Sequence, residues 1–415
     1  MQPGAPLTRA ALAAADAQDP LRELRQRFVL ADNLIYLDGN SLGALPAATP
    51  ARVREVVEQQ WGQDLIRSWN AHGWVDLPQR VGEKIGQLIG ARAGETLVSD
   101  STSVNLFKLL AMALAARPGR RVILTEAGHF PTDLYIAQGL CTLLGERAEL
   151  RVVAPDALLD ALDEDVAVLS LSHVDYRSGR LHDLPGLTRA AHQHGALALW
   201  DLAHSAGVVP LQLATDGVDL AVGCGYKYLN GGPGAPSFVY VSSALQHLSS
   251  PIAGWFGHAR PFAFEPDYLP AAGIGRLLAG TPPILSLAAL EPGVDLALEA
   301  PAEVVREKSM RLTELFIGLV EQELAGHGLE LASPRDAQSR GSQVCLRHPQ
   351  AWPLMQALIA RGVVGDFRAP DLLRFGFAPL YIGYADLWDA VAILRDILQH
   401  RSWDTPACHA RQAVT

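Results

Sequence analysis

The sequence predicts an α/β fold, a mostly parallel sheet covered by helices, with a smaller α+β domain at the C-terminal end. Three observations support this prediction. Short apolar runs that are typical of buried strands alternate with helical periodicity over most of the chain. These runs are apolar on both faces, as expected of parallel strands between two helix layers. The 415 residues exceed an ordinary single domain, and the last third mixes strands and helices.

We expect an N-terminal arm over residues 1–60 that packs on the small domain, a large domain over 61–290, and the small domain over 291–415. Hydrophobic residues make up 49% and charged residues 19%, which is typical of a globular protein with large cores. The net charge of −10 and the lack of a long basic run argue against nucleic acid or an anionic membrane as partner.

No apolar stretch is long enough to span a membrane, and the N-terminus lacks the pattern of a signal peptide. The four cysteines are far apart and fit neither a disulfide framework nor a metal-ligand spacing. They indicate reduced thiols and a cytoplasmic location.

The first elements expected are a helix over 21–28 and a strand over 34–37. The strand leads into DGNSLG (38–43), which contains Asn40 and Ser41 and by itself indicates a surface turn. Helices are expected over 51–61 and 80–89. Between them, His72 lies in an irregular aromatic segment with Trp69 and Trp74, where an exposed loop histidine is the simpler interpretation.

Hydroxyl side chains precede the next helix, expected over 106–116, and include Thr102 and Ser103. Helix capping accounts for one of them, and several together fit a phosphate at the helix N-terminus. A strand over 121–124 leads to HFPTD (129–133), with Phe130 and Asp133, where Pro131 is suited to a first helical turn. Another strand, over 165–171, ends at Ser172.

The most informative stretch runs over 196–240. A buried strand ends at Asp201, His204 follows, and a second strand over 218–222 leads to Tyr226 and Lys227. Lysine is rarely buried without a chemical reason, and desolvation makes its amine nucleophilic. An acid and a lysine at neighbouring strand ends indicate pyridoxal phosphate (PLP), with the acid at the pyridine nitrogen and the lysine in a Schiff base. Alternatively, Asp201 caps a turn and Lys227 is a surface lysine.

Two loops follow, GWFGH (254–258) and AGTPP (279–283), and then a helical region over 285–324, with interruptions expected near Pro292 and Pro301. Arg374 lies inside an apolar strand over 372–376, where its charge needs a partner. Either a structural salt bridge or a substrate carboxylate meets that need.

The motifs WDLAHSAG, GYKYLNGGPG, DGNSLG, HFPTD and GWFGH together resemble the kynureninases, over roughly residues 36–384. This family has the fold of aspartate aminotransferase (fold type I), with a seven-stranded sheet. The resemblance implies PLP-dependent hydrolysis of L-kynurenine to anthranilate and L-alanine. It also implies a homodimer with shared active sites.

The resemblance further implies roles for individual residues. Lys227 would form the Schiff base and act as base, Asp201 would hold the pyridine nitrogen, and Tyr226 would transfer protons and reach the phosphate. Further cofactor contacts would be Thr102, Ser103, Phe130 (stacked on the ring), Asp133, Ser172, His204, Trp255 and Thr281, with Trp255 and Thr281 reaching the neighbouring subunit's phosphate. Substrate contacts would be Arg374, Asn40, Ser41, His72 and Phe256. Thr281, where relatives that prefer 3-hydroxykynurenine have Asn, would favour kynurenine. No metal is expected, because the histidines lack companions at ligand spacing.

Two alternatives remain open. A cysteine desulfurase of the same fold would need a reactive cysteine on a mobile loop near the C-terminal domain. Cys345 lies instead in an apolar strand, and Cys408 lies in the tail. A non-catalytic PLP-binding protein is the other alternative, and the joint presence of Lys227, Asp201 and Arg374 argues against it.

Overall fold

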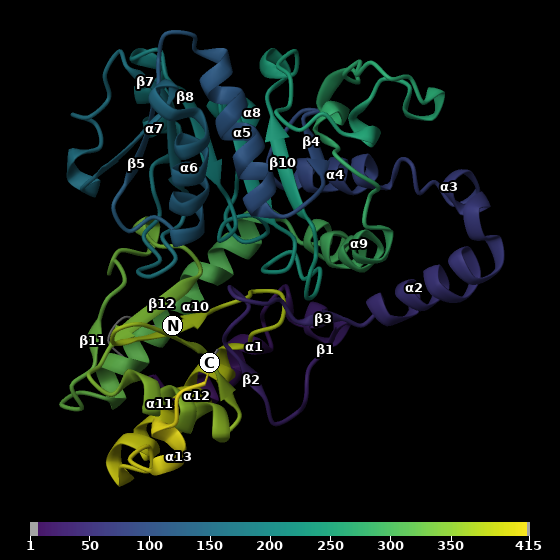
Figure 1. Cartoon of the computed structure of the whole chain (residues 1–415). Helices are drawn as coiled ribbons and strands as arrows, with labels where there is room; N and C mark the ends of the chain where they lie inside the picture. Colours follow the sequence, from purple (N-terminus) through teal and green to yellow (C-terminus); the bar gives the residue numbers. More distant parts are fainter. Residues whose placement is uncertain (1–6, 413–415) are drawn as a thin grey trace. The chain divides into compact units, whose positions relative to one another are not determined.

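The computed structural model describes residues 7–412 and divides into two compact units (Figure 1). The large unit comprises Ala48–Asp175 and His182–Leu298, and the small unit comprises the chain up to Ala47, Tyr176–Leu181 and the chain from Glu299 onward. These divisions differ from the expected boundaries at 60/61 and 290/291. One reason is that helix α9 (Ile284–Glu299) continues past the expected boundary.

The segment Tyr176–Leu181 belongs to the small unit although large-unit residues flank it on both sides. Its backbone pairs with the loop before strand β12: Leu181 N donates to Ser339 O (2.9 Å) and Gly341 N donates to Gly179 O (2.8 Å). Side chains contribute as well, since Arg374 Nη1 (2.7 Å) and Gln343 Nε2 (3.1 Å) both donate to the carbonyl of Tyr176. All these partners are far away in the sequence, so no local pattern reveals the contacts.

A seven-stranded sheet forms the centre of the large unit, within the residues described, in the order β4-β10-β9-β8-β7-β5-β6. All neighbours from β9 to β6 are parallel, and β10 is antiparallel to both of its neighbours. This confirms the predicted mostly parallel sheet. The strands are β4 (Thr96–Val98), β5 (Val122–Glu126), β6 (Glu149–Val153), β7 (Val166–Ser172), β8 (Leu197–Asp201), β9 (Leu220–Cys224) and β10 (Ser237–Val241).

Helices cover both faces of this sheet, as the apolar character of its strands requires (Figure 1). In β8, Leu197 and Leu199 pack in the core that contains α5 (Thr102–Ala116) and α6 (Pro131–Leu144). Ala198 and Trp200 of the same strand pack in the opposite core. The helices of that core are α4 (Leu77–Leu88), α7 (Leu184–Gln193) and α9. Each fully buried leucine stabilises the fold by ~1.5–3 kcal/mol.

Two predicted helices differ in detail from the structure. The helix expected over 51–61 is an α-helix only over Thr49–Glu55 (α2), and wider π-helical turns follow over Val56–Asp64, ahead of α3 (Ser68–Ala71). The interruption expected at Pro292 is wrong, because α9 runs through it. Proline removes one helical hydrogen bond there, and burial of Leu290 and Val294 on the sheet offsets that loss. The expected break at Pro301 is confirmed, since α10 (Ala302–Glu323) begins after it.

The small unit contains, within its described residues, an antiparallel sheet in the order β11-β12-β15-β14. Helix α1 packs on α12, and the Asp16 carboxylate caps α12 by accepting from Tyr384 N (2.6 Å) and Ala385 N (2.9 Å). Residues Arg22–Arg27 form 3₁₀ turns in place of the helix expected over 21–28. The elements are α1 (Arg9–Asp16), β1 (Phe28–Val29), β2 (Ile35–Tyr36), β3 (Leu45–Pro46), β11 (Glu330–Leu331), β12 (Gln343–Arg347), α11 (Ala351–Ala360), β13 (Val363–Val364), β14 (Asp366–Arg368), β15 (Leu372–Gly376), α12 (Tyr384–His400) and α13 (Pro406–His409).

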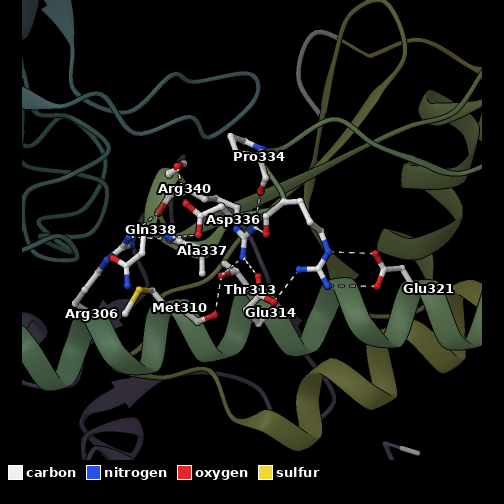
Figure 2. A network of polar contacts seen from close by, with 12 residues as sticks. Arg306, Met310, Thr313, Glu314, Glu321, Pro334, Asp336, Ala337, Gln338 and Arg340 are labelled. Carbon is white, nitrogen blue, oxygen red and sulfur yellow. Dashed lines mark hydrogen bonds and ion pairs between the residues drawn. The ribbon is translucent and has the colours of Figure 1, made fainter. Parts of the chain in front are cut away.

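A buried arginine fixes the loop that leads into β12 (Figure 2). The Arg340 guanidinium, which is fully buried, donates to Glu314 Oε1 (2.6 Å) and Thr313 Oγ1 (3.1 Å) on α10 and to the carbonyl of Arg335 (3.2 Å). Arg306 donates to the Arg340 carbonyl (2.8 Å), and burial lowers the pKa of Arg306 to about 10. These bonds hold the start of β12, the strand that pairs with β15.

Among the described residues, no helix combines the length and the apolar character needed to cross a membrane.

Candidate functional site

Two expected site residues of the large unit stand at the carboxyl ends of its parallel strands. Ser172 and Asp201 are the last residues of β7 and β8 and are paired in register. The Asp201 carboxylate is buried, and its Oδ1 accepts from Ala203 N (2.8 Å). A carboxylate fixed at a strand end in this way faces the crevice where open α/β sheets bind ligands.

Lys227 follows β9, the next strand of the sheet, and its amine meets the other expected residues. Nζ lies 2.8 Å from Nε2 of His204. The ring centres of Phe130 and Tyr226 each lie 5.9 Å from the same nitrogen. The structure therefore brings together four residues that the sequence analysis singled out, and it gives Lys227 a half-buried setting with an imidazole in contact with its amine.

A second acid, Asp133, lies in this group. Burial, and then the charge of Asp201, raise the pKa of Asp133 well above its ordinary value. Its Oδ2 is buried and lies 3.3 Å from Nδ1 of His129, without hydrogen-bond geometry. Neither ring nitrogen of His129 has a hydrogen-bond partner within residues 7–412, and burial lowers the pKa of His129. The charge of Lys227 opposes this rise in the pKa of Asp133 only in part, so the two carboxyl groups form a site that attracts a proton or a cationic ring nitrogen.

The N-terminus of α5 carries Thr102 and Ser103 in its first turn. Ser101 caps the helix by accepting from Val104 N (3.4 Å). First-turn amides have no acceptor within their own helix and suit an anion. The loop before the helix is held by Lys108, which is fully buried, pairs with Asp100, and donates to Leu277 O (2.7 Å). Burial lowers the pKa of Lys108.

The loops GWFGH and AGTPP are neighbours in the structure. Gly254 packs so closely on the backbone of Ala279 that a Cβ there would overlap it. Trp255, 44% exposed, and the exposed Thr281 therefore lie on adjoining segments.

Of the two expected substrate contacts in the large unit, Phe256 is buried, and its ring centre lies 5.5 Å from that of Trp69. His72, three residues after Trp69, forms an ion pair with Asp64 (2.9 Å). That pair is the kind of surface contact that the simpler interpretation of His72 predicts.

The small unit holds the remaining expected residues, Asn40, Ser41 and Arg374. Arg374 is 2% exposed and donates to Asp366 through Nε (2.7 Å to Oδ1) and through Nη2. Nη2 also donates to Ser41 Oγ (2.7 Å), and Nη1 donates to the carbonyl of Tyr176 (2.7 Å). Four of the five N–H groups thus have acceptors, and the charge is balanced by a partner that the sequence analysis did not name. Asn40 lies behind this cluster, with Nδ2 donating to Gln343 Oε1 (3.4 Å).

Sequence reasoning missed Asp366, Lys108 and His129. His129 belongs to the quoted motif HFPTD and was passed over in favour of Phe130 and Asp133. Asp366 and Lys108 lie outside every quoted motif, and the structure reveals their role through their ion pairs.

Comparison with known proteins gives consistent results for the sequence and the fold. Residues 305–394 match the family model described as the kynureninase C-terminal domain. The chain is 52% identical to the kynureninase of Pseudomonas fluorescens over 414 residues, covering 98% of this chain and all of that protein.

Solved structures resemble the chain in fold. The apo cysteine desulfurase of Thermococcus onnurineus NA1 aligns with a TM-score of 0.77 at 16% identity, covering 91% of this chain and 98% of that one. A C-DES mutant with glycine covalently linked to its PLP cofactor aligns with a TM-score of 0.78 at 17% identity, covering 90% and 99%. At such identities the likeness concerns the fold, which is the fold type I architecture that the sequence analysis expected.

Proposed function

This chain belongs to the kynureninase family, and on that premise we propose how its residues divide the work of the reaction. The protein is an enzyme that hydrolyses L-kynurenine to anthranilate and L-alanine, with pyridoxal phosphate as cofactor. The observation that carries the assignment of roles is the meeting of Lys227, His204, Phe130 and Tyr226 beside the carboxyl ends of β7 and β8.

The residues of the large unit fit this cofactor. Asp201 and Asp133 are neighbouring buried acids whose charge the Lys227 amine offsets only in part, because the pKa of Asp133 stays raised; a protonated pyridine nitrogen would add positive charge there. Phe130 offers a ring face near Lys227, and the first turn of α5 offers free amides for a phosphate. When bound, the cofactor withdraws electrons from the substrate Cα and so makes its proton acidic and the Cβ–Cγ bond breakable.

Lys227 would hold the cofactor, and its free amine would take the Cα proton of the substrate on Nζ. His204 Nε2, 2.8 Å away, accepts from or donates to that amine and orients it. Asp201 would keep the pyridine nitrogen protonated.

Burial, and then the nearby charges of Cys224 and Asp201, raise the pKa of Tyr226. Its phenol therefore stays protonated at neutral pH and can donate a proton or a hydrogen bond to the phosphate. Thr102, Ser103 and Ser172 complete the cofactor contacts that we propose.

We assign substrate recognition to Arg374, with Ser41, Asn40, His72 and Phe256 as further contacts. A guanidinium matches the two oxygens of an α-carboxylate and fixes the direction of the Cα–H bond relative to the base. The desulfurase alternative lacks its key residue, because Cys345 is fully buried in β12, opposite Arg374.

A homodimer is the proposed assembly, with Trp255 and Thr281 contacting the cofactor phosphate of the neighbouring subunit. The aromatic surface around GWFGH supports this proposal, since Trp255, Phe262 and Phe264 are exposed, and the Trp255 ring stacks on Phe264 and meets Phe262 edge to face. A cytoplasmic location is also proposed, in keeping with four free cysteines.

A direct assay tests the function. The purified protein is loaded with pyridoxal phosphate and supplied with L-kynurenine, and anthranilate is followed by its fluorescence. Steady production of anthranilate and an equal amount of alanine is expected. Binding of the cofactor without any anthranilate would instead favour the non-catalytic alternative.

A further inference from the structure

The contacts around Arg374 extend beyond a single ion pair. We propose that Asp366 and Asp38 are positioning residues for substrate binding: Asp366 orients the Arg374 guanidinium, and Asp38 sets the net charge that a substrate carboxylate meets. This inference rests on the proposed role of Arg374 and concerns how the small unit prepares that role.

Asp366 restricts which edge of Arg374 can bind a ligand. Its two oxygens take the Nε–Nη2 edge of the guanidinium, as described above. Oδ2 also accepts from Arg368 Nη2 (2.7 Å) and from Ser41 Oγ (2.7 Å). With that edge occupied, an incoming carboxylate must use the Nη1–Nη2 edge, where Ser41 Oγ and the Tyr176 carbonyl now accept.

Asp38 is held beside this cluster by the backbone. Leu37 N donates to Val364 O (2.7 Å), and Gly376 N donates to Leu37 O (2.7 Å), so the residue after Leu37 is fixed next to the end of β15. Asp38 Oδ1 is buried without a hydrogen-bond partner among the described residues. Burial, and then the charge of Asp366, raise the pKa of Asp38 to about 8, against the attraction of Arg374.

The protonation of Asp38 changes the charge of the cluster. When Asp38 is neutral, the two positive charges of Arg374 and Arg368 and the negative charge of Asp366 sum to one positive charge, which attracts a substrate carboxylate. With Asp38 ionised, the same groups sum to zero. Asp38, Asp366 and Arg368 line a cavity of about 700 Å³, and Arg411 lines it as well. The positive charge of Arg411 is the same whether Asp38 is neutral or ionised. Tyr36, also in that cavity, has its pKa raised by burial and by Asp38, and stays neutral.

The sign of the pH effect follows from these charges. Below pH 8 Asp38 is protonated, and the cluster attracts the substrate. Above pH 8 it ionises and the KM for kynurenine rises, whereas kcat is affected only through other groups. A role confined to fold stability would not separate KM from kcat in this way.

The test compares Asp38→Asn, Asp366→Asn and the control Asp371→Asn between pH 6.5 and 9.5, with kynurenine as substrate and L-alanine as competing carboxylate. Asp371 lies between β14 and β15 and forms a surface ion pair with Arg347 (3.1 Å). Asp371→Asn therefore makes the same chemical change, carboxylate to amide, away from the Arg374 cluster. We expect Asp38→Asn to abolish the alkaline rise in KM and in the inhibition constant of L-alanine. Asp366→Asn should raise KM by about tenfold to a hundredfold, as expected for losing charged hydrogen bonds that orient the guanidinium.

The inference is overturned if Asp38→Asn keeps the alkaline rise, or if a folded Asp366→Asn has the KM of Asp371→Asn. Thermal unfolding establishes folding, and if Asp366→Asn does not fold, the Asp38→Asn profile decides alone. The proposed function fails separately, through absence of anthranilate from the wild-type enzyme.

Discussion

The ion pair that supports the start of α5 leads to a prediction about stability. Lys108 has a side chain 0% exposed, whereas that of Asp100 is 28% exposed. Removing Asp100 and removing Lys108 should therefore lower the stability of the fold by different amounts. Asp100→Asn leaves a buried ammonium with neutral acceptors, namely Asn105 Oδ1 (3.3 Å) and Leu277 O (2.7 Å). Lys108→Met leaves a carboxylate that reaches water.

We expect Asp100→Asn to lower the free energy of unfolding by about 3–5 kcal/mol at pH 7, the cost typical of stranding a buried charge. Lys108→Met should cost about 1–3 kcal/mol, because it leaves one buried carbonyl without its donor. The order of the two losses in stability is the informative result, because removing Asp100, the more exposed partner, should do more damage than removing Lys108.

The pH dependence of Asp100→Asn follows from the pKa of Lys108. Burial already lowers that pKa in the folded protein, and Asp100 opposes the decrease. Without Asp100 the folded pKa falls further, so the folded state binds fewer protons than the unfolded state up to the ordinary value of 10.5. Where the unfolded state binds more protons, stability rises with pH. The deficit of Asp100→Asn relative to wild type should therefore shrink from pH 7 towards pH 10.

Urea unfolding of the wild type, both variants and the surface control Asp156→Asn provides the measurement, at several pH values in that interval. Asp156 is exposed and lies on the same unit. Equal losses for the two Lys108–Asp100 variants, or a deficit of Asp100→Asn that is constant with pH, would refute the reasoning.

Three further predictions concern the reaction. Lys227→Ala should abolish anthranilate formation and the covalent retention of cofactor after borohydride reduction, and retention by the variant would point to another lysine. Light scattering should give a dimer, and Trp255→Ala should weaken cofactor binding; a fully active monomer would contradict a shared site. We expect Thr281 to leave the extra hydroxyl of 3-hydroxykynurenine unpaired. An unpaired hydroxyl costs roughly 1–3 kcal/mol, so kcat/KM for kynurenine should be higher by about tenfold to a hundredfold. Equal values would show that Thr281 does not set the preference.

Much of the large unit could be predicted from the sequence because its strands carry a strong local signal. Runs such as Leu197–Asp201 are apolar on both faces, and only a sheet between two helix layers buries both. Unit boundaries carry no such signal. Tyr176–Leu181 joins the small unit through hydrogen bonds to residues far away in the sequence. Helix α9 continues through Pro292 because tertiary packing outweighs the lost hydrogen bond.

The candidate site shows the same contrast. Asp201 and Lys227 could be placed together from the sequence, since both follow buried strands and parallel strands end at one edge. The contact of Lys108 with its partner Asp100 could not be predicted from the sequence. Asp100 precedes the helix in a left-handed conformation (φ 47°), so the eight-residue spacing has no helical periodicity to reveal the contact.

The partner of Arg374 is a different case, because the sequence did contain a signal for it. A charged residue inside an apolar strand requires a countercharge, and the adjoining strand is the nearest source of one. The strands β14 and β15 form a hairpin that turns around Pro370, so positions at equal distance from it face each other, and position 366 lies opposite position 374. The residue at 366 is Asp. Pairing the two strands about the proline would therefore have named the countercharge, and with it a reason for Arg374 to present only one edge to a carboxylate. A substrate carboxylate and a structural salt bridge are then compatible roles for one arginine, since the guanidinium has separate edges for each.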